Sequence, residues 1–284
     1  MLTEDQLRIA LLEQKARGIP LGKVLVALGF LQSRRGSGFY VAARQGTALV
    51  EAGSGEIERA FDNIGVLHQN LNDSNDRLQV GVGWLPPEWM DEEGVLRNIR
   101  ALTRRSDSRV NSYGTAQGYL PLRDQVSLKL LELGIGVRSN QILLTQGATQ
   151  GLDLIAHTLL KPGDSVMVEE PGWAVEFARL SALGMRILPV PRGPEGPDLA
   201  VMARYCEAHA GTPLAPRLFV SVSVLHNPTG ACLSPASAHR VLQLAQRHQF
   251  YIAEDDSYGH LAPPHATRLA QLDGLARTIY VGGF

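Results

Sequence analysis

Polar side chains follow two apolar, strand-like runs in the last third of this chain. The run 217–225 (RLFVSVSVL) is followed by Asn227, and the run 250–254 (FYIAE) is followed by Asp255 and Tyr258. In open α/β sheets, ligands bind outside the carboxyl ends of the strands. A buried carboxylate there can hold a positively charged group, and amide and phenol groups can hydrogen bond to a polar ring. These three residues are therefore candidates for a ligand site.

A glycine-containing turn ahead of a helix is a candidate anion site. Residues 141–145 (QILLT) predict a buried strand, and residues 146–151 (QGATQG) begin the next helix. The free backbone N–H groups and the positive dipole end at the start of a helix bind phosphate. Gly147, Ala148 and Thr149 are therefore candidates for a phosphate cradle.

In their order along the chain, these motifs resemble the fold-type I pyridoxal-phosphate enzymes, the aminotransferase superfamily. The features shared with that family are Asn-Pro-Thr-Gly from Asn227, Asp-x-x-Tyr from Asp255 to Tyr258, and the Tyr-Gly-x-x-x-Gly-x-x-x-Leu-Arg pattern of residues 113–123. The resemblance implies a pyridoxal phosphate cofactor and an amino acid or 2-oxo acid as the small-molecule partner. It also implies a homodimer, in which Tyr113 reaches the phosphate of the neighbouring subunit.

The resemblance gives each candidate residue a role at the cofactor ring. Asp255 would lie beside the pyridine nitrogen and keep it protonated, and its neighbour Asp256 would point away from that nitrogen. Asn227 and Tyr258 would donate hydrogen bonds to the ring oxygen O3′, and Trp173 would stack on the ring face. Taken singly, each of these residues is better explained as a turn, cap or core residue. Their common order and strand context favour the cofactor site.

The covalent anchor of the cofactor is expected just after Phe284, the last residue of this chain. In the family, a strand such as TIYVGGF (residues 278–284) leads into Ser-Lys, and that lysine carries the cofactor as a Schiff base. None of the four lysines in the sequence follows such a strand. They are Lys15, Lys23, Lys129 and Lys161. We therefore expect a fragment of a longer product, of the transaminase family but inactive by itself, and we assign no catalytic residue.

The first 42 residues predict a separate small module. Residues 1–30 predict two short helices, the second over 21–28, and residues 29–42 (GFLQSRRGSGFYVA) resemble the wing of the GntR-type winged-helix DNA-binding domain. In that wing Arg34 and Arg35 would face phosphate. The helices also resemble the N-terminal module of secretion-type ATPases. Without a third helix to read base edges, a hairpin with no ligand is the favoured alternative, and any DNA binding should be weak and independent of sequence.

Composition describes an ordinary globular protein. Hydrophobic residues make up 44% and charged residues 19%, and the net charge of −1 gives no surface built for nucleic acid. No apolar run approaches the roughly 18 residues that span a bilayer. The start does not read as a secretory signal, and Cys206 and Cys232 lack the spacing of metal ligands. We expect a cytoplasmic protein that binds neither a metal nor a membrane.

The chain from residue 78 onward alternates strand-like and helix-like runs. This alternation predicts a mostly parallel sheet with helices on both faces, the α/β fold of an incomplete aminotransferase large domain. Strands are predicted at 141–145, 165–169, 186–190, 217–225, 250–254 and 278–282, and helices at 121–133, 171–183, 198–209 and 234–248, after a first helix from about Asp91.

The predicted organisation is a winged-helix remnant over 1–42, a linker over 43–77 and the aminotransferase-like domain over 78–284. The order of wing, linker and Trp-Leu-Pro-Pro segment (84–87) resembles the MocR-type subgroup of GntR regulators. One hypothesis is therefore a regulator whose aminotransferase-like domain senses pyridoxal phosphate or its amino-acid adduct. The alternative is a fragment of a free-standing amino-acid aminotransferase with an unrelated N-terminal extension. A non-functional product is the third possibility.

Overall fold

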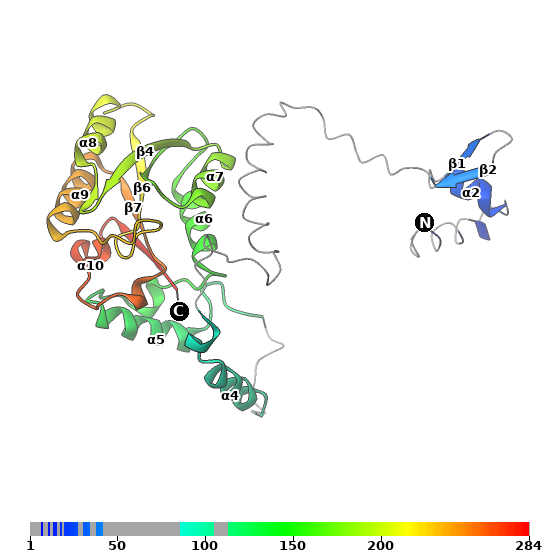
Figure 1. Ribbon diagram of the computed structural model, residues 1–284, viewed down its shortest axis with the longest axis horizontal. Helices are drawn as coiled ribbons and strands as arrows, with labels where there is room; N and C mark the ends of the chain where they lie inside the picture. The colour runs from blue at the N-terminus through cyan, green and yellow to red at the C-terminus, as the bar shows by residue number, and fades with distance from the viewer. Residues whose placement is uncertain are drawn as a thin grey trace. The chain divides into compact units, whose positions relative to one another are not determined.

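The computed structural model describes residues 21–27, 31–34, 38–41, 86–104 and 113–283, together with a few isolated positions before residue 21. The chain divides into two compact units, one up to Arg59 and one from Ala60 onward (Figure 1). Each unit is considered by itself below. The predicted linker over 43–77, most of the first predicted helix, the tip of the predicted wing and Phe284 lie outside the described residues.

The described residues of the smaller unit form a helix and a β-hairpin. Helix α2 spans Leu21–Ala27, and its residues Val24 and Leu25 are buried. Strands β1 (Leu31–Arg34) and β2 (Gly38–Val41) pair in antiparallel fashion. The second predicted helix and the predicted hairpin are thus confirmed.

The larger unit is built on a six-stranded sheet in the order β5-β4-β3-β6-β7-β8. All neighbouring strands are parallel except the pair β4–β5, so the prediction of a mostly parallel sheet is confirmed. The strands are β3 (Ser165–Glu170), β4 (Arg186–Gly193), β5 (Gly196–Pro197), β6 (Pro216–Ser221), β7 (Tyr251–Asp256) and β8 (Thr278–Gly282).

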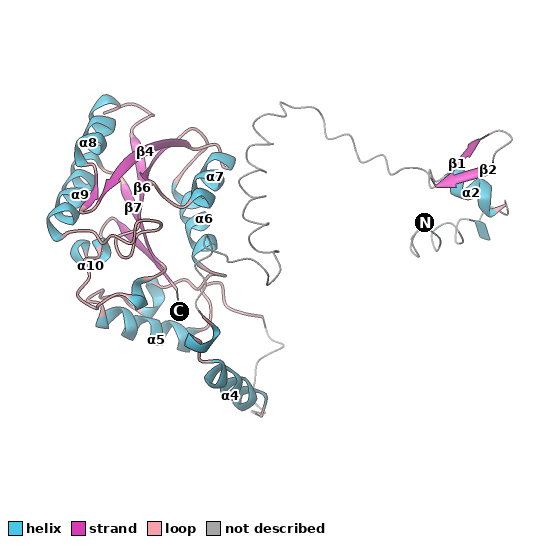
Figure 2. Cartoon of the chain, in the orientation of Figure 1, coloured by secondary structure: helices cyan, strands magenta, loops and turns pink. Residues whose placement is uncertain are grey.

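Helices cover both faces of this sheet (Figure 2). They are α6 (Ala148–Leu159), α7 (Ala174–Ala182), α8 (Leu199–Ala208), α9 (Pro235–His248) and α10 (Leu269–Asp273). The unit also contains α4 (Glu92–Thr103), α5 (Leu120–Glu132) and the short 3-10 turns η1 (Pro87–Trp89), η2 (Ser139–Gln141) and η3 (Gly259–Leu261). Side chains of a strand alternate between the two faces. Met167 of β3 therefore packs with α8, α9 and α10, while its neighbours Val166 and Val168 pack with α6 and α7.

Two of the longer helices begin at capping residues in the sequence. The Asp198 carboxylate accepts hydrogen bonds from the backbone N–H groups of Ala200 and Val201 at the start of α8. The Ser234 hydroxyl accepts from the N–H of Ser237 at the start of α9. Such caps satisfy N–H groups that have no partner within the helix. They explain why the predicted helix starts at 198 and 234 agree with the structure.

The predicted strand over 141–145 is wrong. The segment runs from η2 into extended chain that pairs with no strand in the described part of the protein, and the Leu144 N–H donates instead to the Gln117 carbonyl at 3.0 Å. Gly118, at φ +92°, brings that turn close to Leu144, because a Cβ on residue 118 would lie 2.6 Å from the Leu144 Cβ. The apolar run is held by a glycine turn rather than by a sheet.

Two of the other predicted elements are shorter in the structure. The strand predicted over 217–225 ends at Ser221, and the helix predicted from 171 begins at Ala174. The hairpin partner β5 and the helix α10 were not predicted, because each is too short to show a periodic pattern.

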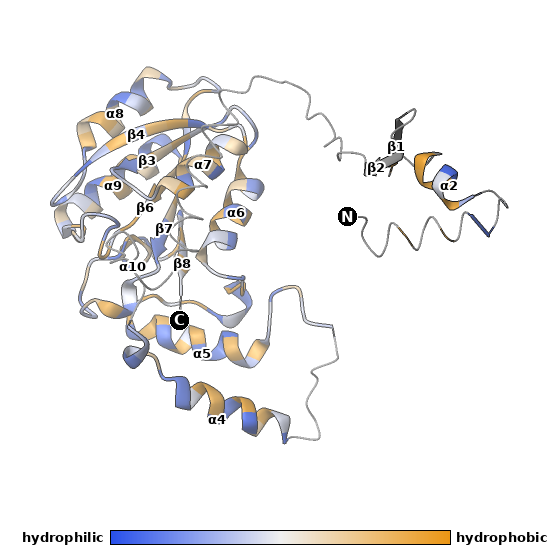
Figure 3. Cartoon of the chain, turned by 45° about the vertical axis from the view of Figure 1, so that its right-hand side comes forward, coloured by the Kyte–Doolittle hydropathy of each residue, from blue (hydrophilic) through white to orange (hydrophobic). Residues whose placement is uncertain are grey.

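Helix α4 carries an apolar stripe that faces solvent in this structure. Val95, Leu96, Ile99 and Leu102 are all exposed, and Figure 3 shows apolar residues along both α4 and α5. None of the helices in the described ranges combines the length and the hydrophobicity that crossing a bilayer needs.

Candidate functional site

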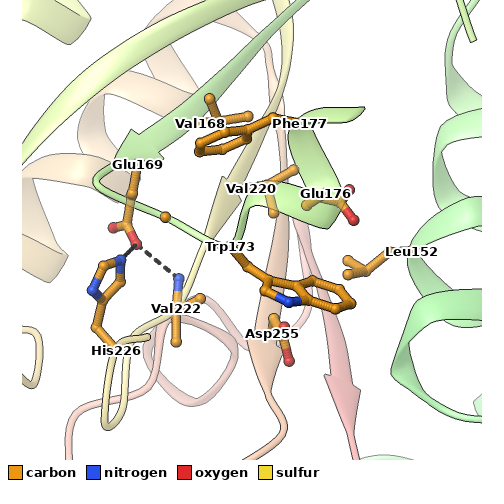
Figure 4. A pocket seen from close by; sticks show the side chains of 11 residues that line it. Leu152, Val168, Glu169, Trp173, Glu176, Phe177, Val220, Val222, His226 and Asp255 are labelled. Carbon is orange, nitrogen blue, oxygen red and sulfur yellow. Dashed lines mark hydrogen bonds and ion pairs between the residues drawn. The ribbon is translucent and has the colours of Figure 1, made fainter. Parts of the chain in front are cut away.

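A pocket lies at the carboxyl ends of the central strands, where the sequence predicts a ligand site. Its apolar wall comes from α6, β3, α7 and β6 through Leu152, Val168, Phe177 and Val220. Its polar and aromatic residues are Glu169, Trp173, Glu176, His226 and Asp255 (Figure 4). Two of the predicted site residues, Trp173 and Asp255, are therefore brought together.

Asp255 offers a carboxylate to this pocket. It is partly buried near the end of β7, and its Oδ1 accepts hydrogen bonds from the N–H of Ser257 at 3.0 Å and the hydroxyl of Ser257 at 2.6 Å. Burial raises the pKa of Asp255, and the two hydrogen bonds from Ser257 oppose that rise. A cation in the pocket would favour the ionised carboxylate. Trp173, directly before α7, places its indole above Asp255 in Figure 4 and supplies a flat surface for a ring.

The start of α6 has the features of an anion site. Gly147 precedes the helix at φ 85°, a backbone geometry that glycine adopts without strain, and none of the described side chains caps the helix. A Cβ at Gly147 would meet nothing within 4 Å, so the turn is open. The first N–H groups of α6, those of Ala148 and Thr149 among them, are thus free of a capping side chain. Leu152, one turn further along α6, lines the pocket.

Apart from the three residues of the α6 turn, three further predicted site residues do not line the pocket. Asn227 is partly buried and directly follows His226, which does line it. Tyr258 is 39% exposed, and Tyr113 is fully exposed. The roles predicted for these three residues stay predictions.

The predicted position of the covalent anchor is not tested by the structure. Phe284, just after which the Schiff-base lysine is expected, lies outside the described residues. The described chain reaches the end of β8, the strand that is expected to lead into that lysine, and Val281 of β8 packs against α6. The strand itself is therefore confirmed, whereas the lysine after Phe284 stays a prediction.

Glu169 is a pocket residue that the sequence did not single out. It is buried at the end of β3 and accepts hydrogen bonds from Arg192 of β4, from the Ser221 hydroxyl at 3.1 Å and from the Val222 N–H at 3.0 Å. Burial raises the pKa of Glu169, and the Arg192 guanidinium opposes the rise. One carboxylate thereby joins β3, β4 and the end of β6 at the base of the pocket. In the sequence, the pair Glu169-Glu170 at the end of an apolar run was the feature that could have indicated a carboxylate at this strand end.

His226 is held as a neutral side chain beside Glu169. Its Nε2 lies 3.4 Å from Glu169 Oε2, and its Nδ1 lies 2.9 Å from the Thr229 hydroxyl. Burial, with a contribution from Arg192, lowers the pKa of His226 to about 4. The hydrogen bond between the His226 ring and Thr229 spans the turn that carries Asn227.

The two adjacent aspartates of β7 face different surroundings, as expected. Asp256 is buried away from the pocket, where its Oδ2 accepts from Arg268 Nε at 2.7 Å and from the Tyr280 hydroxyl at 2.7 Å. Glu254, on the same side of β7, accepts from the N–H of Leu269 at the start of α10. Asp255 alone of these three carboxylates reaches the pocket.

Comparison with known proteins agrees with this geometry. The profile of the family described as aminotransferase class I and II matches residues 75–284. A 2-aminoadipate transaminase of Thermus thermophilus is 30% identical over 208 residues, which are 71% of this chain and 50% of that protein. Two regulators also match. The uncharacterized HTH-type transcriptional regulator YdfD of Bacillus subtilis is 28% identical, and the match covers 75% of this chain and 43% of YdfD. The probable rhizopine catabolism regulatory protein MocR of Rhizobium meliloti is 25% identical, and the match covers 92% of this chain and 52% of MocR.

Solved structures show the same fold. The α-aminoadipate aminotransferase LysN of Thermus thermophilus, solved in complex with N-(5'-phosphopyridoxyl)-L-leucine, has a TM-score of 0.63 and 28% identity, over 71% of this chain and 50% of its own. An archaeal alanine:glyoxylate aminotransferase has a TM-score of 0.71 and 22% identity, and the match covers 78% of this chain and 56% of that protein. The chain spans about half the length of the curated relatives it matches.

The residues present fit pyridoxal phosphate, the cofactor that these relatives indicate. Asp255 and Trp173 suit a protonated pyridine ring, and the open turn at Gly147 suits a phosphate. No lysine lines the pocket within the described ranges. When bound, the cofactor supplies an electron sink, and the protein supplies orientation and electrostatics. By its sequence and its fold, the chain belongs to the aminotransferase class I and II family of pyridoxal-phosphate proteins.

Proposed function

We propose that this chain is the aminotransferase-like, pyridoxal-phosphate-binding part of a MocR/GntR-type transcriptional regulator. One observation carries the proposal. The match to MocR extends over 269 residues, so it includes part of the chain ahead of residue 75, which the family profile does not reach. The match to the Thermus transaminase covers 71% of the chain. The β1–β2 hairpin, at the position where a winged helix has its wing, supports the same proposal.

In this proposal the pocket holds a ring and a phosphate. Asp255 binds the ring nitrogen and keeps its proton, and Trp173 stacks on the ring. The N–H groups of Ala148 and Thr149, freed by the turn at Gly147, bind the phosphate. Asn227 and Tyr258 hydrogen bond to O3′. These contacts orient the ring so that an amino acid or a 2-oxo acid meets it from the open side.

The proposal also includes a homodimer, a cytoplasmic location and a DNA-binding partner for the whole protein. Tyr113 is fully exposed, as a residue that reaches the phosphate of the partner subunit would be before assembly. In the regulator, occupancy of the pocket by cofactor or by its amino-acid adduct would be the signal that the DNA-binding part reads.

The alternative is that the chain is part of a free-standing aminotransferase acting on an amino acid and a 2-oxo acid. The 30% identity to the 2-aminoadipate transaminase favours it, since that is the highest identity among the relatives compared above. Both functions use the same pocket, and they differ in what the N-terminal residues do.

Two measurements test the proposal. Pyridoxamine 5′-phosphate should bind the folded chain, Asp255→Asn should remove that binding, and borohydride treatment after incubation with pyridoxal phosphate should fix no adduct to a lysine. The product of the gene's full reading frame should then be used to select DNA from a random library, with and without pyridoxal phosphate. A shared recovered sequence supports the regulator. Transamination by that product with no sequence recovered supports the alternative, and failure of the probe to bind refutes both.

A further inference from the structure

Glu176 is a buried carboxylate in the pocket wall that has no part in the contacts proposed above. It lies in the first turn of α7, three residues after Trp173, and is 6% exposed. It lines the pocket together with Trp173 and Asp255, and Figure 4 shows its carboxylate and that of Asp255 on either side of the indole in this view. A first-turn glutamate is favoured by the helix dipole, but glutamate is almost never buried without a partner.

A single arginine pairs with two of the three carboxylates around this wall. Glu176 Oε2 accepts a hydrogen bond from Arg179 Nη1 at 3.0 Å, and Arg179 Nη2 pairs with Asp153 of α6. The third carboxylate is Asp255 of β7, whose hydrogen bonds come from Ser257 and not from a cation. These are the charged groups that face Glu176 from α6, α7 and β7. With all of them ionised, negative charges outnumber positive ones next to an apolar, aromatic pocket, which favours a cationic ligand.

We propose that Glu176 is a second carboxylate of the ring-nitrogen site, and that with Asp255 it holds the protonated form of a pyridine-type ring stacked on Trp173. The inference rests on the proposed function, because it takes the ring to occupy this pocket. Asp255 contacts the ring nitrogen, whereas Glu176 acts on the ring charge through space. An ionised Glu176 therefore strengthens binding of the ring cation and opposes loss of the ring proton.

The charge of Glu176 changes near neutral pH. Burial raises the pKa of Glu176 to about 7; the Arg179 guanidinium opposes the rise, and the Asp255 and Asp153 carboxylates add to it. Glu176 is thus mostly neutral at about pH 6 and mostly ionised at about pH 8. A bound cation favours the ionised form and lowers this pKa, so by linkage the cation binds more tightly at the higher pH. Each unit by which binding lowers the pKa contributes up to about a tenfold gain in affinity.

The test uses pyridoxamine 5′-phosphate, which carries the ring and the phosphate but needs no lysine. Its dissociation constant for the 284-residue chain is measured by calorimetry at about pH 6 and about pH 8. The wild type is compared with Glu176→Gln and with Glu207→Gln, an equal change of net charge at an exposed site on α8. Because the phosphate and the ring of the probe also titrate, the compared quantity is the ratio of the two affinities in each protein.

We expect the ratio of affinity at high pH to affinity at low pH to fall about tenfold in Glu176→Gln and to stay at the wild-type value in Glu207→Gln. Probe labelled with nitrogen-15 in the ring should show, by NMR at the higher pH, a ring proton that is retained in the wild type and partly lost in Glu176→Gln. Circular dichroism checks that each variant is folded.

Equal affinity ratios in the wild type and Glu176→Gln overturn the inference. In that case, loss of binding in Asp255→Asn leaves the proposed function standing. If the folded wild type does not bind the probe at either pH, the proposed function fails and takes the inference with it. The two failures are therefore distinguishable.

Discussion

Removing the charge of Asp256 should destabilise the whole larger unit, although Asp256 has no contact with the pocket. Asp256 is 1% exposed and pairs with Arg268, which is 0% exposed. In Asp256→Asn the guanidinium would stay buried without its counterion, and the Tyr280 hydroxyl would lose a charged acceptor. Breaking one partner of a buried ion pair costs about 3–5 kcal/mol. We expect a loss of that size in the free energy of unfolding.

The neighbouring residue supplies a matched control. Asp255→Asn removes the same charge one residue earlier, but Asp255 is partly exposed and, among the described residues, its side chain hydrogen bonds to Ser257 alone. Its cost in stability should be about 1 kcal/mol. Its effect should instead appear as lost affinity for pyridoxamine phosphate, which Asp256→Asn should retain wherever it is folded.

Urea unfolding followed by circular dichroism measures the free energy of unfolding of both variants. The two values can be compared if the dependence of that free energy on urea concentration is unchanged. A cycle of Asp256→Leu, Arg268→Met and the double variant separates the pair from its surroundings. Because the double variant leaves no buried charge unpaired, it should cost less than the sum of the two single variants. A loss below about 1 kcal/mol in Asp256→Asn, or additive costs in the cycle, would refute the assignment of this pair to the stability of the fold.

Three further predictions follow from single groups. Trp173→Ala should weaken binding of pyridoxamine phosphate by on the order of 1 kcal/mol beyond the lost contact area, measured by calorimetry, with little change in unfolding. Burial raises the pKa of Glu254 to about 6 from an ordinary 4.5, so the folded chain binds that proton more tightly than the unfolded chain. The free energy of unfolding of the wild type, measured by urea unfolding, should therefore fall by about 2 kcal/mol relative to that of Glu254→Gln as the pH rises from about 4.5 to about 6. With a thiol reagent at about pH 8, exposed Cys232 should react quickly, whereas Cys206, buried and with its pKa raised by burial to about 11, should react only as the chain unfolds.

The sheet was largely predictable because its strands are apolar runs with turn residues at both ends. The strand predicted over 278–282 agrees with β8, and the capped helices α8 and α9 begin where predicted. The run 141–145 has the same apolar character but is no strand, because pairing depends on a neighbour that an isolated run does not specify. The turn at Gly118, which belongs to an earlier segment of the chain, decides how that run is held.

The candidate site was predictable only in part. The family motifs led to Trp173 and Asp255, which the structure brings together. Glu169 and His226 were not assigned to the pocket, because their place in it depends on contacts that join three strands and a turn. Glu176 was also missed, since a glutamate in the first turn of a helix is ordinarily a solvated residue that favours the helix dipole.

The three consecutive carboxylates at the end of β7, Glu254, Asp255 and Asp256, face two different sides of the sheet. Ile252 packs on the α8, α9 and α10 side of the sheet, and Ala253 packs on the α6 and α7 side. Because side chains alternate, Glu254 and Asp256 continue the face of Ile252, and Asp255 continues the face of Ala253, where the pocket lies. Glu254 and Asp256 then bind the start of α10 and the arginine directly before it. The two flanking carboxylates thereby fix β7 against α10, and Asp255 faces the pocket. A shift of one residue in the register of β7 would exchange these positions, so the alternation places Asp255, and not Asp256, in the pocket.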